Sequence, residues 1–173
     1  MIFLRHPRPK VAAGICYGRL DVPLRPGAAA EIAGTLKTLP KVSRVISSPA
    51  QRCRRLADAI GRFHGVEVEA DPRLWELNFG AWEGQRWDMI DRGESDPWAA
   101  DPMHVAPPGG ETFAKLLARV EAALKNIPPD AAVVTHAGVI RAAKMLLTGA
   151  AFEAVFAERI PYARSLYLMR ESA

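Results

Sequence analysis

The chain has 173 residues, of which 49% are hydrophobic and 24% are charged, and its formal net charge is +4 at pH 7. A chain of this length can bury a self-sufficient core, and its composition is that of a globular protein, which excludes intrinsic disorder. No apolar stretch approaches the ~18 residues that a membrane span requires. The apolar run at residues 1–4 is too short for a secretory signal, and Cys16 and Cys53 form no metal-ligand pattern. We therefore expect a cytoplasmic protein.

The charge is unevenly distributed along the chain. Residues 1–65 contain 12 Lys and Arg against 3 Asp and Glu, residues 66–111 contain 3 against 11, and residues 112–173 contain 8 against 5. The N-terminal basic residues stand singly among apolar ones, without the interleaved aromatic residues of a nucleic-acid-binding module. We expect no nucleic-acid partner and no membrane partner, while the pattern is compatible with a local basic pocket for a small anion.

Strands and helices are expected to alternate from the start of the chain. Residues 1–4 are apolar and predict a buried strand. Residues 26–39 predict a helix, with Pro26 near its first turn and apolar residues recurring on one face. Residues 42–47 predict a second strand.

A second helix is expected to begin at the sequence Ser-Pro-Ala-Gln, residues 48–51. Ser48 can cap the helix, Pro49 suits the first helical position, and Gln51 can reach back as in a capping box. Gly65 is expected to end this helix just after His64.

The remaining elements follow from apolar periodicity. Further strands are expected at residues 66–69, 131–135 and 165–169, and further helices at 113–127 and 139–147. The segment 71–110 is rich in Trp, Pro, Gly and acidic residues, and we interpret it as a lid-like excursion with short helices. We expect one domain over residues 1–173 and an α/β fold: a three-layer α/β/α sandwich around a mainly parallel central sheet.

Two of the expected strands end in histidine. Arg5 and His6 follow the first strand, and His136 follows the strand at 131–135. Ligands of such sheets bind just past the carboxyl ends of the strands. Phosphoryl transfer depends on positioning and on neutralising the phosphoryl oxygens, which Arg5, His136 and Arg52 near a helix start can supply. Glu76, among apolar and aromatic residues, is a candidate proton donor.

Five motifs in order carry a resemblance: Arg5-His6, Ser47 to Arg52, Glu76 to Gly84, Pro108 to Glu111, and Thr135 to Gly138. Together they resemble the histidine phosphatase superfamily, with its phosphoglycerate-mutase-like fold, over most of the chain. The resemblance implies that His6 is the nucleophile, that Arg5, Arg52 and His136 bind phosphoryl oxygens, and that Glu76 is the proton donor. It implies no metal and no other cofactor.

Four further residues are expected to bind substrate: Gly18, Trp82, Gly110 and Glu111. The alternatives are that tryptophans of the excursion only pack, that Gly110 only forms a turn, and that Glu111 only starts a helix. Glu83 is a rival to Glu76 as the acid, or a structural carboxylate.

Two residues depart from the family pattern. Leu56 stands where the helix after Arg52 commonly carries threonine. Pro7 stands where members of the family usually have glycine, which removes a backbone donor and fixes φ.

Within the superfamily, the motifs at residues 16–32, 76–87 and 107–113 most resemble α-ribazole phosphatases of cobalamin biosynthesis. The expected partner is a small phosphorylated substrate. Two alternatives remain: a broad-specificity or sugar-phosphate phosphatase, and a catalytically silent relative that binds a phosphorylated ligand. A homodimer is also left open.

Overall fold

The computed structural model describes residues 1–169, and its centre is a five-stranded sheet of order β3-β2-β4-β1-β5. The strands are β1 (Ile2–Arg5), β2 (Val45–Ser47), β3 (Val68–Ala70), β4 (Ala132–Thr135) and β5 (Ser165–Tyr167). Strands β1 to β4 pair in parallel, whereas β5 runs antiparallel to β1. The mainly parallel sheet predicted from the alternation of elements is therefore confirmed.

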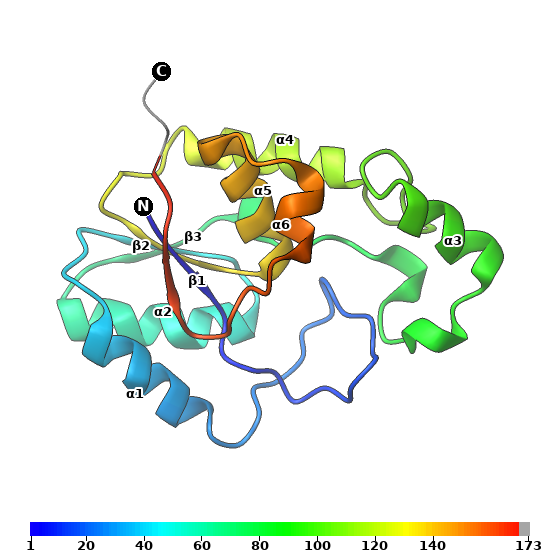
Figure 1. The fold of residues 1–173 in the computed structure, drawn as a ribbon. Helices are drawn as coiled ribbons and strands as arrows, with labels where there is room; N and C mark the ends of the chain where they lie inside the picture. The colour runs from blue at the N-terminus through cyan, green and yellow to red at the C-terminus, as the bar shows by residue number, and fades with distance from the viewer. Residues whose placement is uncertain (170–173) are drawn as a thin grey trace.

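Helices cover both faces of the sheet (Figure 1). Helices α1 (Ala28–Thr38) and α2 (Gln51–His64) lie on one face, and α4 (Phe113–Leu124), α5 (Ala137–Thr148) and α6 (Phe152–Ala157) lie on the other. Strand β1 shows how both layers are filled: Ile2 and Leu4 pack with residues of α2, while Phe3 packs with residues of α4 and α5. Successive side chains of a strand point to opposite faces, so a continuous apolar run serves two cores. The three-layer α/β/α sandwich is confirmed.

The predicted start of α2 is wrong. The helix begins at Gln51, with Ala50 as its N-cap residue, and Ser48 does not cap it. The Ser48 hydroxyl lies 2.8 Å from Nε2 of His136 and 3.4 Å from the Ala50 nitrogen. The Gln51 N–H donates instead to the Asp21 carboxylate at 3.2 Å. A histidine from the end of β4 takes the hydroxyl that the capping box would have used. The predicted end at Gly65 is confirmed, at a φ of 67°.

Smaller differences concern element lengths and one missed helix. The strands predicted at 42–47, 66–69 and 165–169 are observed at Val45–Ser47, Val68–Ala70 and Ser165–Tyr167. Helix α6 was not predicted, although Phe152, Val155 and Phe156 have helical spacing. Its Phe152 and Phe156 rings pack edge-on against Phe113 of α4.

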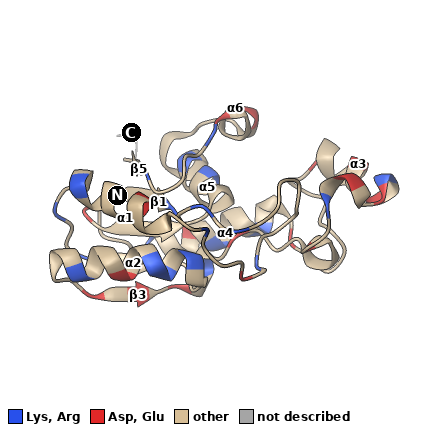
Figure 2. Cartoon of the chain, turned by 90° about the horizontal axis from the view of Figure 1, so that it is seen from below, with Lys and Arg blue, Asp and Glu red and all other residues tan. Residues whose placement is uncertain are grey.

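The segment 71–112 contains three 3₁₀ helices and one α-helix. They are η1 (Pro72–Leu74), η2 (Gly80–Trp82), η3 (Trp87–Met89) and α3 (Arg92–Ala100). Helix α3 lies away from the sheet, beyond the carboxyl ends of the parallel strands (Figure 1). Figure 2 shows acidic bands on α3 and several basic bands on α2, in line with the uneven charge of the sequence. Within residues 1–169, every helix is too short or too polar to cross a membrane.

Candidate active site

The ends of β1 and β4 bring two histidines together. Arg5 pairs with Thr135 in the parallel register, and the His6 N–H donates to the Thr135 carbonyl at 2.9 Å. The next residue on each strand is a histidine, and the centroids of the His6 and His136 rings are 5.3 Å apart. Adjacent central strands therefore place side by side two residues that are 130 positions apart in sequence.

His6 is a buried, neutral imidazole with a defined tautomer. Its side chain is 2% exposed, and Nδ1 lies 2.7 Å from the Pro7 carbonyl. A carbonyl can only accept, so Nδ1 carries the proton and Nε2 keeps its lone pair. Burial, followed by the positive charge of Arg52, lowers the pKa of His6 to about 3. Proline at position 7 has no backbone N–H, but it keeps the carbonyl that orients the His6 ring.

His136 is also neutral, with the opposite tautomer. It is completely buried, and Nδ1 lies 3.2 Å from a terminal nitrogen of Arg52. A guanidinium can only donate, so Nδ1 accepts and Nε2–H donates to the Ser48 hydroxyl at 2.8 Å. Burial and then the charge of Arg52 hold the pKa of His136 well below its usual value.

Two arginines supply positive charge to the histidines. Arg52 is 1% exposed, and its terminal nitrogens donate to the carbonyls of Gly18 and Leu20. Arg5 donates to the Ile160 carbonyl and the Tyr162 hydroxyl, each at 2.9 Å. The Nε–H groups of both arginines are buried and have no acceptor within the described part of the chain. An unpaired buried donor is costly, so two of them on cations beside a histidine indicate an anion-binding site.

The Glu76 carboxyl group contacts the start of α5 at Gly138, which lies two residues beyond His136. Its Oε2 accepts the Gly138 N–H at 3.1 Å, and its Oε1 accepts the Leu77 N–H at 3.0 Å. A carboxylate at a helix N-terminus is favoured by the unpaired N–H groups there. The contact requires Gly138, because a Cβ at that position would lie 2.3 Å from Oε1 of Glu76.

Glu83, the rival acid, holds a loop instead. Its carboxylate accepts the backbone N–H groups of Gly18, Arg19, Leu20 and Phe79 at 2.8 to 3.1 Å. These bonds anchor the 18–20 loop, whose carbonyls in turn hold Arg52. The structural alternative for Glu83 is the one that its contacts support.

Gly18 lies at a point of close backbone contact. A Cβ at Gly18 would meet the Leu77 carbonyl at 1.9 Å. Gly110 is similar, since its Cβ would meet the Asn78 carbonyl at 2.5 Å. Both glycines are needed for packing between the loops that surround Glu76.

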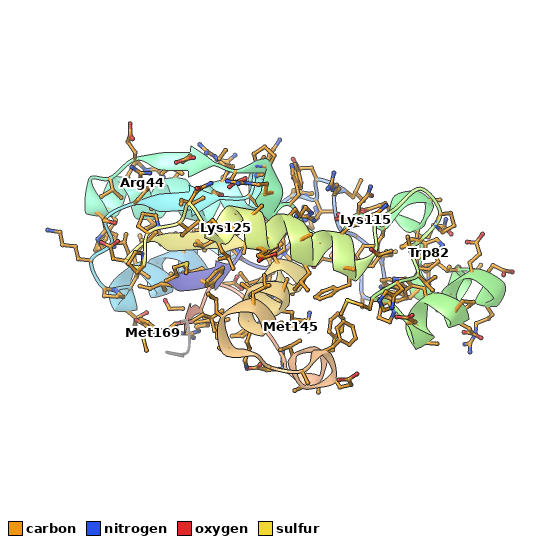
Figure 3. All side chains as sticks on the ribbon, turned by 90° about the horizontal axis from the view of Figure 1, so that it is seen from above. Arg44, Trp82, Lys115, Lys125, Met145 and Met169 are labelled. Atoms are coloured by element: carbon orange, nitrogen blue, oxygen red, sulfur yellow. The ribbon has the colours of Figure 1, made fainter. Side chains whose placement is uncertain are left out.

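Trp82 and Glu111 make contacts with protein groups. Trp82 is 1% exposed, packs with Cys16 and Ile90, and lies near α3 (Figure 3). Glu111 pairs with Arg119 at 2.7 Å and accepts the Asn78 N–H at 2.9 Å.

Sequence reasoning missed three residues around the site. The Tyr162 ring lies 5.6 Å from the His6 ring, and its hydroxyl is 3.2 Å from the Tyr17 hydroxyl. Both tyrosines line a pocket of about 760 Å³ with the 8–15 loop and Arg25. Arg119 donates to backbone carbonyls next to Glu76. No local motif marks these residues, although Tyr17 lies within the 16–32 block already noted.

A comparison of the sequence with protein families agrees with the geometry of this site. The model of the histidine phosphatase superfamily (branch 1) matches residues 1–171. The chain belongs to the histidine phosphatase superfamily.

Relatives of this histidine phosphatase include named enzymes. A protein of Hydrogenobacter thermophilus with the name "Putative phosphoserine phosphatase 2" is 30% identical over 149 residues, which cover 81% of this chain and 73% of that protein. A bifunctional protein of Mycobacterium tuberculosis is 38% identical over 93 residues, 51% of this chain and only 25% of that protein. The superfamily and its phosphatase relatives show that the protein is a phosphatase.

Solved structures match the fold of this histidine phosphatase closely. An α-ribazole phosphatase from Shigella flexneri has a TM-score of 0.85 at 22% identity, over 95% of this chain and 87% of that one. A mycobacterial glucosyl-3-phosphoglycerate phosphatase has a TM-score of 0.77 at 24% identity, over 91% and 82%. At these identities the likeness shows the fold, which is phosphoglycerate-mutase-like.

The buried histidines of this phosphatase predict a pH-dependent stability. The pKa of His6 is about 3 in the folded state against 6.5 for an unperturbed histidine. Between these values the unfolded state binds more protons, so the free energy of unfolding falls as pH decreases from 6.5. Each buried neutral histidine lowers the free energy of unfolding by up to about 1.4 kcal/mol for each unit by which the pH falls.

Urea denaturation between about pH 7 and pH 5 measures this slope. We expect His6→Asn to reduce the slope of the free energy of unfolding against pH by the contribution of one histidine. His104→Gln is the control at an exposed histidine, whose Nδ1 contacts the Asp101 carboxylate. An equal slope in wild type and His6→Asn would contradict the assignment of His6 as a neutral buried group.

Proposed function

We propose that the enzyme is a phosphomonoesterase that acts through a phosphohistidine on His6, without a metal ion, on a small organic phosphate. One observation carries the proposal: a neutral histidine with a free Nε2 lies beside two arginines that each keep a buried Nε–H without a partner among residues 1–169. This pairing joins a nucleophile to donors for the phosphoryl oxygens. Within residues 1–169, no three His, Cys, Asp or Glu side chains gather in an arrangement that could hold a metal ion.

In the first step, the Nε2 lone pair of His6 attacks phosphorus and the ester P–O bond breaks. Arg5 and Arg52 bind the phosphoryl oxygens and neutralise their charge. The neutral His136 donates to one of these oxygens once its Nε2–H leaves the Ser48 hydroxyl. Glu76 gives its proton to the departing alkoxide, and Nδ1–H of His6 stays on the Pro7 carbonyl. The products are a free alcohol and a phosphohistidine.

In the second step, water attacks the phosphohistidine and the N–P bond breaks. Glu76, now ionised, takes a proton from that water and returns to its starting state. One water is consumed, and inorganic phosphate leaves. The pair Arg5 and Arg52 serves both steps because the transferred group keeps its charge throughout.

The rest of the substrate is proposed to occupy the pocket of about 760 Å³ lined by Tyr17, Tyr162 and the 8–15 loop. His6 is almost fully buried beside Tyr162, whose hydroxyl lies 3.2 Å from the Tyr17 hydroxyl, so we expect side chains around His6 to move when a phosphoryl group reaches Nε2. The lining combines apolar Val11 and Ile15 with the cations of Arg8, Lys10 and Arg25. Such a lining suits an organic phosphate with an apolar part.

We propose α-ribazole 5′-phosphate as the substrate, supported by the sequence motifs and by the fold shared with the Shigella flexneri enzyme. Phosphate release in EDTA is measured from this compound beside phosphoserine, glucosyl-3-phosphoglycerate, 3-phosphoglycerate and p-nitrophenyl phosphate. A strong preference for α-ribazole 5′-phosphate supports the specific assignment. Indiscriminate turnover favours the broad-specificity alternative. Binding of phosphate without any turnover favours the silent relative, and loss of activity in EDTA contradicts the metal-free mechanism.

The contact between Gly138 and Glu76 predicts a large effect of a single methyl group. In Gly138→Ala, the new Cβ would lie 2.3 Å from Oε1 and 3.2 Å from Cδ of Glu76, so the carboxyl group must move. A misplacement of about 1 Å can cost on the order of 10²-fold in rate. We expect a loss of that size in kcat/KM for the best alkyl phosphate of the panel.

Gly34→Ala is the matched control, because Gly34 lies in α1 and a Cβ there meets nothing within 4 Å. This change should leave activity unchanged and stabilise the fold by about 0.5–1 kcal/mol. Full activity in Gly138→Ala would show that the observed position of Glu76 is not needed for turnover.

A further inference from the structure

Arg119 of α4 holds the backbone on both sides of the Glu76 side chain. One terminal nitrogen donates to the carbonyls of Arg73 and Trp75, each at 2.6 Å. The other donates to the carbonyl of Glu76 itself at 3.0 Å. One guanidinium therefore satisfies three carbonyls of the four-residue segment that ends at Glu76.

Glu111, in the loop just before α4, completes the arrangement. Its carboxylate binds Arg119 through both oxygens, at 2.7 and 3.2 Å. The same carboxylate accepts the Asn78 N–H at 2.9 Å, and the Glu111 N–H donates to the Asn78 carbonyl at 2.9 Å. Arg119 thus binds the Glu76 carbonyl. Two residues later, Glu111 binds both the N–H and the carbonyl of Asn78.

The pair is mostly buried, which makes its geometry specific. The side chains of Arg119 and Glu111 are 17% and 12% exposed. A planar guanidinium presents donors in a fixed fork, so a bidentate pair specifies direction as well as distance. A buried ion pair adds little to the stability of the fold, so we interpret this pair by the geometry that it imposes on its neighbours.

We infer that Arg119 and Glu111 are positioning residues for the proton transfer by Glu76, an inference that rests on the proposed function. The Glu76 carboxyl group reaches the start of α5 only if its backbone stays in place against α4. Arg119 supplies that link directly from α4. This reassigns Glu111, which the sequence predicted to bind substrate, to a role in holding the acid.

The test compares two leaving groups. An alkoxide leaves poorly and needs a proton from the acid, whereas p-nitrophenolate leaves without much help, as general acid catalysis requires. In kcat/KM, which reports the steps through departure of the alcohol, we expect Arg119→Met to lose on the order of 10²-fold for an alkyl phosphate. The loss for p-nitrophenyl phosphate should be far smaller. A merely structural residue would lower both rates together.

Arg73→Met is the matched control. Arg73 also ties this segment to α4, through the Ala122 carbonyl at 2.9 Å, but its other partner is Asp71 rather than the residues around Glu76. It should keep the wild-type ratio between the two substrates. Glu111→Gln and Arg119→Lys should shift the ratio less than Arg119→Met, because each retains part of the contact set, and they decide the matter if Arg119→Met does not fold.

Glu76→Gln separates failure of this inference from failure of the proposed function. If Glu76→Gln selectively lowers kcat/KM for the alkyl phosphate and the Arg119 and Glu111 variants do not, the inference is overturned and the proposed function stands. If Glu76→Gln lowers kcat/KM equally for both substrates, the assignment of Glu76 as the acid fails, and the inference fails with it.

Discussion

Replacement of His6 by asparagine is expected to lower kcat by on the order of 10⁶-fold, the size of loss seen when an enzyme loses its nucleophile. Asparagine keeps an N–H that can donate to the Pro7 carbonyl, so the loop should hold its shape. The change removes the outer part of the imidazole ring, including Nε2 with its lone pair. The loss would therefore report on nucleophilic catalysis rather than on folding.

The intermediate itself is the decisive measurement for His6. Wild-type enzyme mixed with labelled p-nitrophenyl phosphate and quenched in base should carry label on His6, and His6→Asn should carry none. Because the pKa of His6 is about 3, the neutral nucleophile persists well below pH 6 and sets no acid limb near neutral pH. Turnover by His6→Asn within tenfold of wild type would rule out the phosphohistidine mechanism.

Replacement of Glu76 by glutamine is expected to reduce alkyl phosphate hydrolysis by about 10²- to 10⁴-fold, the usual contribution of a general acid. Glutamine keeps the shape and one oxygen for the Gly138 N–H, but it cannot deliver a proton. Both steps should slow, because Glu76 also activates the water of the second step.

Rapid-mixing kinetics distinguish those two steps. With p-nitrophenyl phosphate, Glu76→Gln should release one equivalent of nitrophenol quickly and then stall as the phosphohistidine, since only the second step still needs Glu76. Glu83→Gln is the control for the rival carboxylate. It should weaken the 18–20 loop and lower stability without producing a burst. A burst in Glu83→Gln and none in Glu76→Gln would exchange the two roles.

Sequence reasoning succeeded where the chemistry follows directly from a strand end. An apolar run that stops at Arg5-His6, and another that stops at His136, predict two histidines at one edge of a parallel sheet. The observed register brings the rings of His6 and His136 to 5.3 Å. The alternation of elements likewise predicted the sandwich, because helices must cover both faces of a buried parallel sheet.

Sequence reasoning failed where a side chain has several partners within reach and only the assembled fold selects one. Ser48 has the pattern of a helix cap, but His136 arrives from 88 residues away and takes its hydroxyl. Glu111 was expected to bind substrate or to start a helix, and only the fold shows that its carboxylate binds Arg119. Trp82 was expected to line the pocket or to pack, and only the fold shows that it packs with Cys16 and Ile90.

The amino-acid sequence by itself therefore determined the layered fold, the strand-end histidines and the set of candidate charged groups, because local periodicity and strand termination are properties of short stretches. Only the tertiary structure decided which protons these groups carry and which carboxylate holds a loop. The Pro7 carbonyl sets the tautomer of His6, Arg52 sets that of His136, and four backbone N–H groups occupy Glu83. Each of these outcomes depends on desolvation and on hydrogen bonds between distant segments, which exist only once the chain is packed.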